Sequence, residues 1–133
     1  MIVVDTNIIA YLWIPGNATG GVKELVEREP AWAAPFLWRS EFRNVLAGAI
    51  RRKTISVETA LRAAEAAESH LRNHEYFVSS ELVMRFVSES KCSAYDCEFV
   101  AVAHDLRVPL VTTDDQILRE FPKVAVKLSE FVK

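Results

Sequence analysis

The 133-residue sequence has few cysteines and no long apolar run. Cys92 and Cys97 are its only cysteines, and no further Cys or His stands at zinc-ligand spacing, so we expect quiet, partly buried thiols rather than a structural metal site. No apolar run approaches the roughly 20 residues of a membrane span. The start of the sequence does not resemble a signal peptide, and sparse cysteine fits a reducing compartment. We therefore expect a cytoplasmic protein without a membrane partner.

Signatures of several common enzyme classes are also missing. Dehalogenase-type phosphatases need Asp-x-Asp after the first strand, and here Asp5 is followed by Asn7 where the second acid would stand. Gly20 and Gly21 precede neither a Lys-Ser/Thr pair nor a G-x-x-G pattern, which excludes a P-loop and a dinucleotide-binding turn. A phospho-receiver domain needs an acidic pair at the first strand and a lysine after a late strand, and neither is present.

The spacing of the apolar residues predicts an α/β fold. A chain of 133 residues has the size of one domain, so we assign residues 1–133 to a single domain. Strand-like runs occur at residues 2–4, 32–34, 76–78, 109–113 and 124–128. Helical patterns lie at residues 6–13, 20–28, 36–52, 56–73, 80–90 and 93–106. Apolar strands separated by helices indicate a parallel sheet covered on both faces, a three-layer α/β/α domain.

Two carboxylates follow directly on strands of this predicted sheet. "IVVDTN" (2–7) places Asp5 after an apolar run, and "PLVTTDDQIL" (109–118) places Asp114 and Asp115 after another. In open α/β sheets, ligands bind beyond the carboxyl ends of the strands. Asp5 and Asp114 are therefore expected at the same edge of the sheet.

Two further acids lie on predicted helices. Glu41 falls on the shoulder of an apolar stripe in "WRSEFRNVL" (38–46), and Asp96 falls within an apolar sector of "SAYDCEFVAVAH" (93–104). A carboxylate that faces a core needs a partner. Other interpretations stay open at this point. Asp5 or Asp114 would also serve as a helix cap, Asp96 stands at capping-box spacing from Ser93, and Glu41 fits a solvated helix position.

If the four acids converge, electrostatics requires a cation among them. Two carboxylates about 5 Å apart repel by roughly 3 kcal/mol at an effective dielectric constant near 20. An all-oxygen cluster without His or Cys suits the hard ions Mg²⁺ and Mn²⁺. Such ions activate water and clamp phosphodiesters in nucleases.

Four segments together resemble a known family. "VVDTNIIAYL", "SEFRNVL", "SAYDCEFVAVA" and "PLVTTDDQIL", in this order and spacing, resemble a PIN domain and are most similar to the toxin ribonucleases of VapBC-type toxin–antitoxin pairs. The resemblance implies a parallel sheet of about five strands and a Mg²⁺ or Mn²⁺ site. The catalytic acids it implies are Asp5, Glu41, Asp96 and Asp114, and those that hold the metal are Asp5, Asp96 and Asp114. It places Thr6, Asn7 and Thr112 beside the metal.

The resemblance also implies an activity and partners. PIN-domain toxins cut RNA endonucleolytically through a metal-activated water, which leaves 3′-hydroxyl and 5′-phosphate ends. They are usually homodimers, and an antitoxin silences them by laying its C-terminal segment over the active-site groove. The alternative is a catalytically silent PIN scaffold that acts only as a protein-binding module.

Basic residues share the helix of Glu41. The net charge of −2 gives no general sign of nucleic-acid binding, so any such role rests on a local patch. We predict phosphate contacts from this helix, with a merely solvated face as the alternative. The candidates are Arg39, Arg43, Arg51, Arg52 and Lys53. His70 and His104 are interpreted as surface or boundary residues without a catalytic role.

Asp114 and Asp115 are adjacent acids for which we expect different roles. Residues of a strand alternate between its two faces, so Thr112 and Asp114 are expected to face the metal together. Asp115 then lies in the first turn of the next helix, where its charge can still affect the site.

The early aromatic residues are expected to line an antitoxin groove, a dimer seam or the core. They are Tyr11, Trp13, Trp32 and Trp38.

Overall fold

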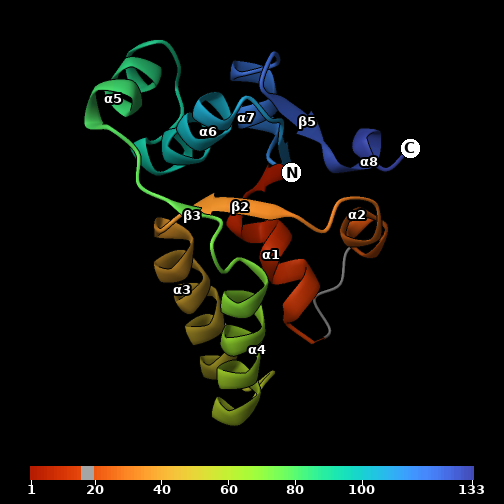
Figure 1. The fold of residues 1–133 in the computed structure, drawn as a ribbon. Coiled ribbons are helices and arrows are strands. Elements are labelled where there is room, and N and C mark those ends of the chain that lie inside the picture. The colour runs from red at the N-terminus through yellow and green to blue at the C-terminus, as the bar shows by residue number, and fades with distance from the viewer. Residues whose placement is uncertain (16–19) are drawn as a thin grey trace.

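Five parallel strands form one sheet in the order β3-β2-β1-β4-β5 (Figure 1). The computed structural model describes residues 1–15 and 20–133. The strands are β1 (Ile2–Val4), β2 (Trp32–Pro35), β3 (Glu75–Tyr76), β4 (Leu110–Thr112) and β5 (Ala125–Lys127). Every pairing is parallel, which confirms the predicted sheet.

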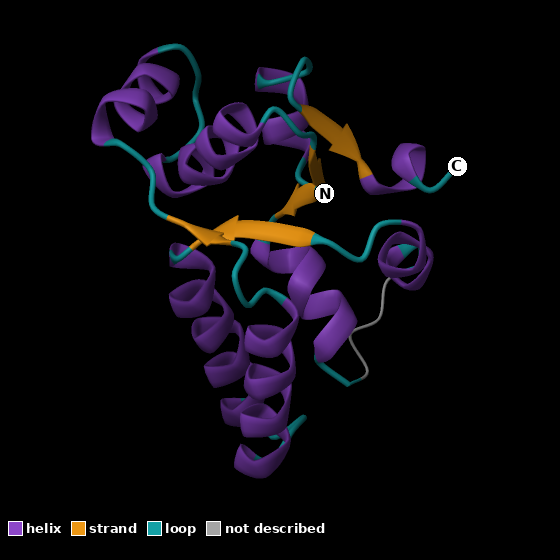
Figure 2. Cartoon of the chain, in the orientation of Figure 1, coloured by secondary structure: helices purple, strands orange, loops and turns teal. Residues whose placement is uncertain are grey.

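Helices cover both faces of this sheet (Figure 2). One face carries α1 (Thr6–Trp13), α3 (Leu37–Arg51) and α4 (Val57–His70), and the other carries α5 (Ser80–Ser88) and α6 (Ala94–Leu106). The remaining helices are α2 (Val22–Arg28), α7 (Asp115–Glu120) and α8 (Leu128–Phe131). The predicted three-layer α/β/α architecture is therefore confirmed. No helix in the described part of the chain is long and apolar enough to cross a membrane.

The strand order reverses between β1 and β4. β1 pairs with β2 on one side and with β4 on the other, in the register Val4↔Val111. The carboxyl ends of β1 and β4 therefore lie side by side, at the switch point where α/β folds bind ligands. Asp5 is the next residue after β1, and Thr112 is the last residue of β4.

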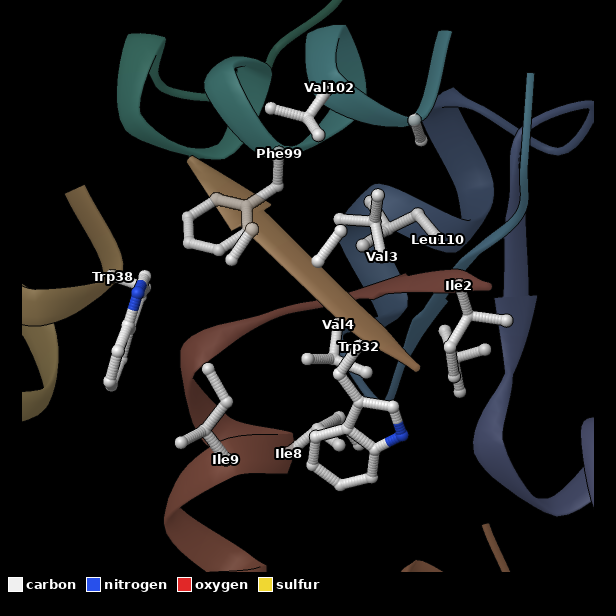
Figure 3. Packing of buried hydrophobic residues seen from close by; sticks show 14 of the residues in the cluster. Ile2, Val3, Val4, Ile8, Ile9, Trp32, Trp38, Phe99, Val102 and Leu110 are labelled. Carbon is white, nitrogen blue, oxygen red and sulfur yellow. The ribbon is translucent and has the colours of Figure 1, made fainter. Parts of the chain in front are cut away.

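The core lies between the sheet and its two helical layers. Figure 3 shows Phe99 and Val102 of α6 on one side of the sheet and Ile8 and Ile9 of α1 on the other. Each fully buried side chain of this size stabilises the fold by roughly 1.5–3 kcal/mol relative to exposure. Trp32 and Trp38 belong to this core and are completely buried. These two tryptophans are thus core residues, whereas Tyr11 and Trp13 are only half-buried.

Some element boundaries differ from the predicted ones. The helix predicted from residue 20 begins at Val22, because Gly21 has a φ of 101°, in the left-handed region. The last strand ends at Lys127 rather than residue 128, since Leu128 opens the short helix α8, which the sequence pattern did not predict. The third strand spans residues 75–76 instead of 76–78.

Candidate functional site

A cleft of about 250 Å³ opens at the carboxyl edge of the sheet, at the switch point. Residues from α1, α3, α6 and α7, or directly before them, line it. They are Asp5, Thr6, Asn7, Glu41, Asn44, Val45, Asp96, Phe99, Asp114 and Ile117. All four acids singled out in the sequence thus lie around one cavity, although they are up to 109 residues apart in the chain.

Asp5 occupies the base of the cleft and caps helix α1. Its Oδ1 accepts a hydrogen bond from the backbone N–H of Ile8 at 3.1 Å, and its Oδ2 accepts one from the Thr112 hydroxyl. The side chain is 8% exposed. Burial raises the pKa of Asp5 to about 6, and the negative charges of Asp114 and Asp96 act in the same direction. The hydrogen bonds only partly oppose this rise.

Asp114 caps α7 from the opposite side of the switch point. Its Oδ1 accepts from the backbone N–H of Ile117 at 3.0 Å, and its own N–H donates to Thr112 Oγ1 at 2.9 Å. The fully buried Thr112 therefore connects the two strand-end acids. Capping and lining the cleft are not alternatives for Asp5 and Asp114, because each residue does both. Asp115 is exposed in the first turn of α7 and does not line the cleft.

Glu41 enters from the second turn of α3. The Thr6 hydroxyl donates to Glu41 Oε1 at 2.7 Å, which fixes this carboxylate against the start of α1. Burial raises the pKa of Glu41, and the charges of Asp96 and Glu98 add to the effect. Glu98, which the sequence analysis did not single out, also has a pKa raised by burial, but it lies outside the cleft lining.

Asp96 lies in the first turn of α6. Ser93 caps this helix and accepts a hydrogen bond from the Asp96 N–H at 3.1 Å, so the expected capping spacing is real. The half-buried carboxylate also lines the cleft. Burial raises the pKa of Asp96 first, and the charge of Asp114 raises it further. For each of Asp5, Glu41 and Asp96, the negative charge of at least one other acid contributes to the raised pKa, so these carboxylates repel one another across the cleft.

The donor set fits a hard divalent cation. Every polar side chain that lines the cleft is a carboxylate, a hydroxyl or a carboxamide and can bind a cation through oxygen. Neither sulfur nor imidazole is among the lining groups. Within residues 1–15 and 20–133, no three His, Cys, Asp or Glu side chains are arranged to hold a metal ion as they stand. Mg²⁺ usually takes only one or two carboxylates and keeps several waters, so it does not need such a cage.

Comparison with known proteins places the chain in a family. A family model for the PIN domain matches residues 2–125. The chain belongs to the PIN domain family. No curated protein matches this sequence significantly.

Three solved structures resemble this PIN domain in fold. PAE2754 from Pyrobaculum aerophilum has a TM-score of 0.77 and 20% identity, over 98% of this chain and 92% of that one. A toxin–antitoxin complex from Klebsiella pneumoniae has a TM-score of 0.71 and 20% identity, over 96% and 98%. VapC20 (Rv2549c) from Mycobacterium tuberculosis, a sarcin–ricin loop cleaving toxin, has a TM-score of 0.62 and 22% identity, over 90% and 94%. At these identities the likeness concerns the fold.

One polar residue that lines the cleft of the PIN domain was not predicted from the sequence. Asn44 lies on α3 three positions after Glu41 and lines the same cavity. Residues three apart on a helix share a face, and this spacing from Glu41 was the available signal. Thr6 and Asn7, which the family resemblance placed beside the metal, both line the cleft, and Thr112 lies directly behind it.

The basic residues of α3 and of the two positions after it divide into two groups. The Arg39 guanidinium binds Glu75 through Nε at 2.6 Å and Nη2 at 2.8 Å, and Glu68 through Nη1 at 2.6 Å. This guanidinium joins α3, α4 and β3 within the fold, and a phosphate contact by Arg39 stays a prediction. The others are exposed but do not line the cleft, namely Arg43, Arg51, Arg52 and Lys53.

The histidines and cysteines of the PIN domain lie outside the cleft. His70 Nε2 is 2.8 Å from the Pro30 carbonyl oxygen, and its ring packs on Trp32. His104 is exposed near the end of α6. Both cysteines are buried, and burial raises the pKa of Cys92 to about 11. Buried thiols with raised pKa values are poor nucleophiles at neutral pH, and both cysteines are more deeply buried than predicted.

Proposed function

We propose that this PIN domain is a Mg²⁺- or Mn²⁺-dependent endoribonuclease that acts in the cytoplasm as the toxin of a toxin–antitoxin pair. The observation that carries the proposal is the convergence of Asp5, Glu41, Asp96 and Asp114 on one cleft. Burial and mutual repulsion raise the pKa of the first three, and no Lys, Arg or His is among the described residues that line the cavity. A bound cation would relieve the repulsion among these negative charges.

Asp5, Asp96 and Asp114 would hold the ion, directly or through the waters that Mg²⁺ keeps. Asp5 and Asp114 come from adjacent strand ends, and Asp96 reaches the same cavity from α6. When bound, Mg²⁺ or Mn²⁺ supplies positive charge against the phosphodiester and lowers the pKa of a water that it holds. The Thr112 hydroxyl donates to Asp5 Oδ2 and accepts from the backbone N–H of Asp114, so one side chain orients both acids.

Glu41 is the proposed proton acceptor. It lies outside the set of residues that would hold the ion, and the Thr6 hydroxyl holds its Oε1 in place. Its raised pKa brings this carboxylate closer to the operating pH, which favours proton transfer from an attacking water. In-line attack would leave a 3′-hydroxyl on one RNA fragment and a 5′-phosphate on the other. Asp115 would act on the site only at a distance, through its charge.

Exposed arginines supply the proposed phosphate contacts. Arg43 is next to the cleft residue Asn44, whereas Arg51 and Arg52 lie at the far end of α3. Phosphate contacts from such residues give salt-dependent binding without base specificity.

An apolar groove supports the proposed antitoxin partner. Leu12 and Trp13 of α1, Val26 of α2 and part of α4 line this groove, away from the acids. An amphipathic segment binds such a groove through its apolar side chains. The fold similarity to a toxin–antitoxin complex is compatible with a partner of this kind.

A stacked pair of exposed phenylalanines supports the proposed homodimer. The rings of Phe36 and Phe77 lie 4.5 Å apart, and Phe77 is 87% exposed. Exposed apolar patches of this kind commonly mark protein contacts. Trp32 and Trp38, which the sequence also offered for a seam, are buried in the core.

Cleavage of a structured RNA by the purified protein tests the proposed activity. Wild-type protein should cut with Mg²⁺ or Mn²⁺, stop in EDTA and leave 3′-hydroxyl ends. Asp5→Asn, purified in parallel, should be inactive, which controls for contaminating nuclease. Activity that survives thorough chelation would refute metal dependence. A folded wild-type protein that never cuts RNA but binds an antitoxin would instead support the silent protein-binding module.

A further inference from the structure

The cleft assigned to RNA has very few hydrogen-bond donors for an anionic substrate. Its described lining consists of four acids, three apolar side chains, Thr6, Asn7 and Asn44. The Thr6 hydroxyl already donates to Glu41 Oε1. The two carboxamides are therefore the only lining side chains in the described chain that keep N–H groups for a ligand.

Asn44 has no evident task in the fold. It lies in the interior of α3, where asparagine is a weaker helix former than alanine, and it is far from both helix caps. Its side chain is exposed, and no group among the described residues hydrogen-bonds to its carboxamide. An amide at position 44 therefore does not stabilise the fold, whereas its place in the cleft lining lets it contact a ligand.

We propose that Asn44 is a substrate-binding residue whose carboxamide donates to a phosphate oxygen of the RNA beside the cleaved bond. This inference rests on the proposed ribonuclease function. Asn44 lies about 4.5 Å further along α3 than Glu41, given a rise of about 1.5 Å per residue, and both residues line the cleft.

A neutral donor suits this position better than a charged one. A lysine or arginine three residues after Glu41 would form an ion pair with it and remove the free carboxylate. A carboxamide offers two N–H donors and leaves the charge of Glu41 unchanged. The adjacent Arg43, which points outside the cleft lining, can then supply the long-range attraction for the RNA.

Steady-state cleavage of one short RNA at a fixed Mg²⁺ concentration and several KCl concentrations separates these roles. We expect Asn44→Ala to lower kcat/KM roughly 10- to 100-fold, the range for a lost hydrogen bond to a charged group, at every salt concentration. The salt slope should stay unchanged, because no charge is lost. Arg43→Gln should instead reduce the slope of log(kcat/KM) against log[KCl] by about 0.7.

Two controls make the result specific. Ser40→Ala changes an exposed residue of α3 that does not line the cleft, and it should cut like the wild type. Asn44→Asp keeps the shape but replaces the donor with a fifth negative charge, and it should lose more activity than Asn44→Ala. The Mn²⁺ affinity of Asn44→Ala, measured by calorimetry, should equal that of the wild type, and its melting temperature should not fall.

Each outcome decides one claim. If Asn44→Ala cuts as well as Ser40→Ala, the inference is wrong and the proposed ribonuclease stands. A parallel loss of Mn²⁺ affinity in Asn44→Ala would show that the amide serves the cation rather than the RNA, which also overturns it. If wild-type protein cuts no RNA at any salt concentration, the proposed function fails, and the inference fails with it.

Discussion

Replacement of Asp5 by asparagine should stabilise the metal-free protein at neutral pH and abolish activity. The folded-state pKa of Asp5 is about 6, above the ordinary 3.8, because the side chain is buried beside other acids. The ionised form is therefore destabilised by folding. This cost is absent below about pH 4, grows as the pH rises to about 6, and is fully present above that. Asparagine carries no charge and avoids it.

The structure sets the size of the effect. A pKa shift of about two units at 1.36 kcal/mol per unit corresponds to about 3 kcal/mol. Asparagine keeps the Ile8 cap through its remaining oxygen, since Asn and Asp are equally good N-caps. It presents an amide to the Thr112 hydroxyl, which loses its acceptor at a cost of about 1 kcal/mol. The net gain at pH 7.5 is then about 2 kcal/mol, or roughly 6–8 °C in melting temperature for a domain of this size.

Thermal unfolding in EDTA, followed by circular dichroism from pH 4 to pH 8, measures this difference. The advantage of Asp5→Asn should disappear near pH 4 and become a loss of about 1 kcal/mol, the cost of the Thr112 bond alone. Asp115→Asn removes an exposed neighbouring charge and should show no such crossover. Equal destabilisation of Asp5→Asn at both ends of the pH range would show that Asp5 serves hydrogen bonding only, and the reasoning about a repulsive acid cluster would be refuted.

Three further predictions concern other parts of the molecule. Asp114→Asn should remove nearly all RNA cleavage while Asp115→Asn keeps most of it, because only Asp114 lines the cleft; equal losses in a cleavage assay would make Asp115 a ligand. Glu75→Gln should lower the unfolding free energy measured in urea by about 1–3 kcal/mol at pH 7, because Arg39 and Trp38 both donate to this carboxylate. The hydrogen bond from Arg39 lowers the pKa of Glu75, so the difference should vanish as the pH falls through that pKa; a difference constant down to pH 3 would exclude the ion pair as its source. Phe77→Ser should convert a dimer into a monomer in light scattering at micromolar concentration, and an unchanged mass would remove Phe77 from the interface.

The strand-end acids were predictable because strand ends are encoded locally. An apolar run followed at once by a carboxylate marks both Asp5 and Asp114, and parallel pairing brings such ends to one edge. The phase of Asp96 within an apolar helical sector was a second local signal. These two patterns marked three of the four acids that line the cleft, and the position of Glu41 on the shoulder of an apolar helical stripe marked the fourth.

Features that depend on distant partners were not predictable in this way. Arg39 has the same helix and charge as Arg43, and the approach of Glu68 and Glu75, 29 and 36 positions away, distinguishes the two. Thr112 and Asp5 are 107 positions apart, so the hydrogen bond between them has no sequence signature. The exposure of Phe77 and the burial of Trp32 follow from tertiary packing, which composition does not specify.

A calorimetric titration with Mn²⁺ tests most directly whether Asp5, Asp96 and Asp114 hold a cation in the cleft. Wild-type protein should bind Mn²⁺, and binding at pH 6 should release a fraction of a proton, because Asp5 is partly protonated there. At pH 8 the proton release should vanish. Asp5→Asn and Asp114→Asn should lose binding, and Asp115→Asn should retain it. Absence of Mn²⁺ binding by the wild type, or equal affinity in Asp114→Asn, would contradict the central claim.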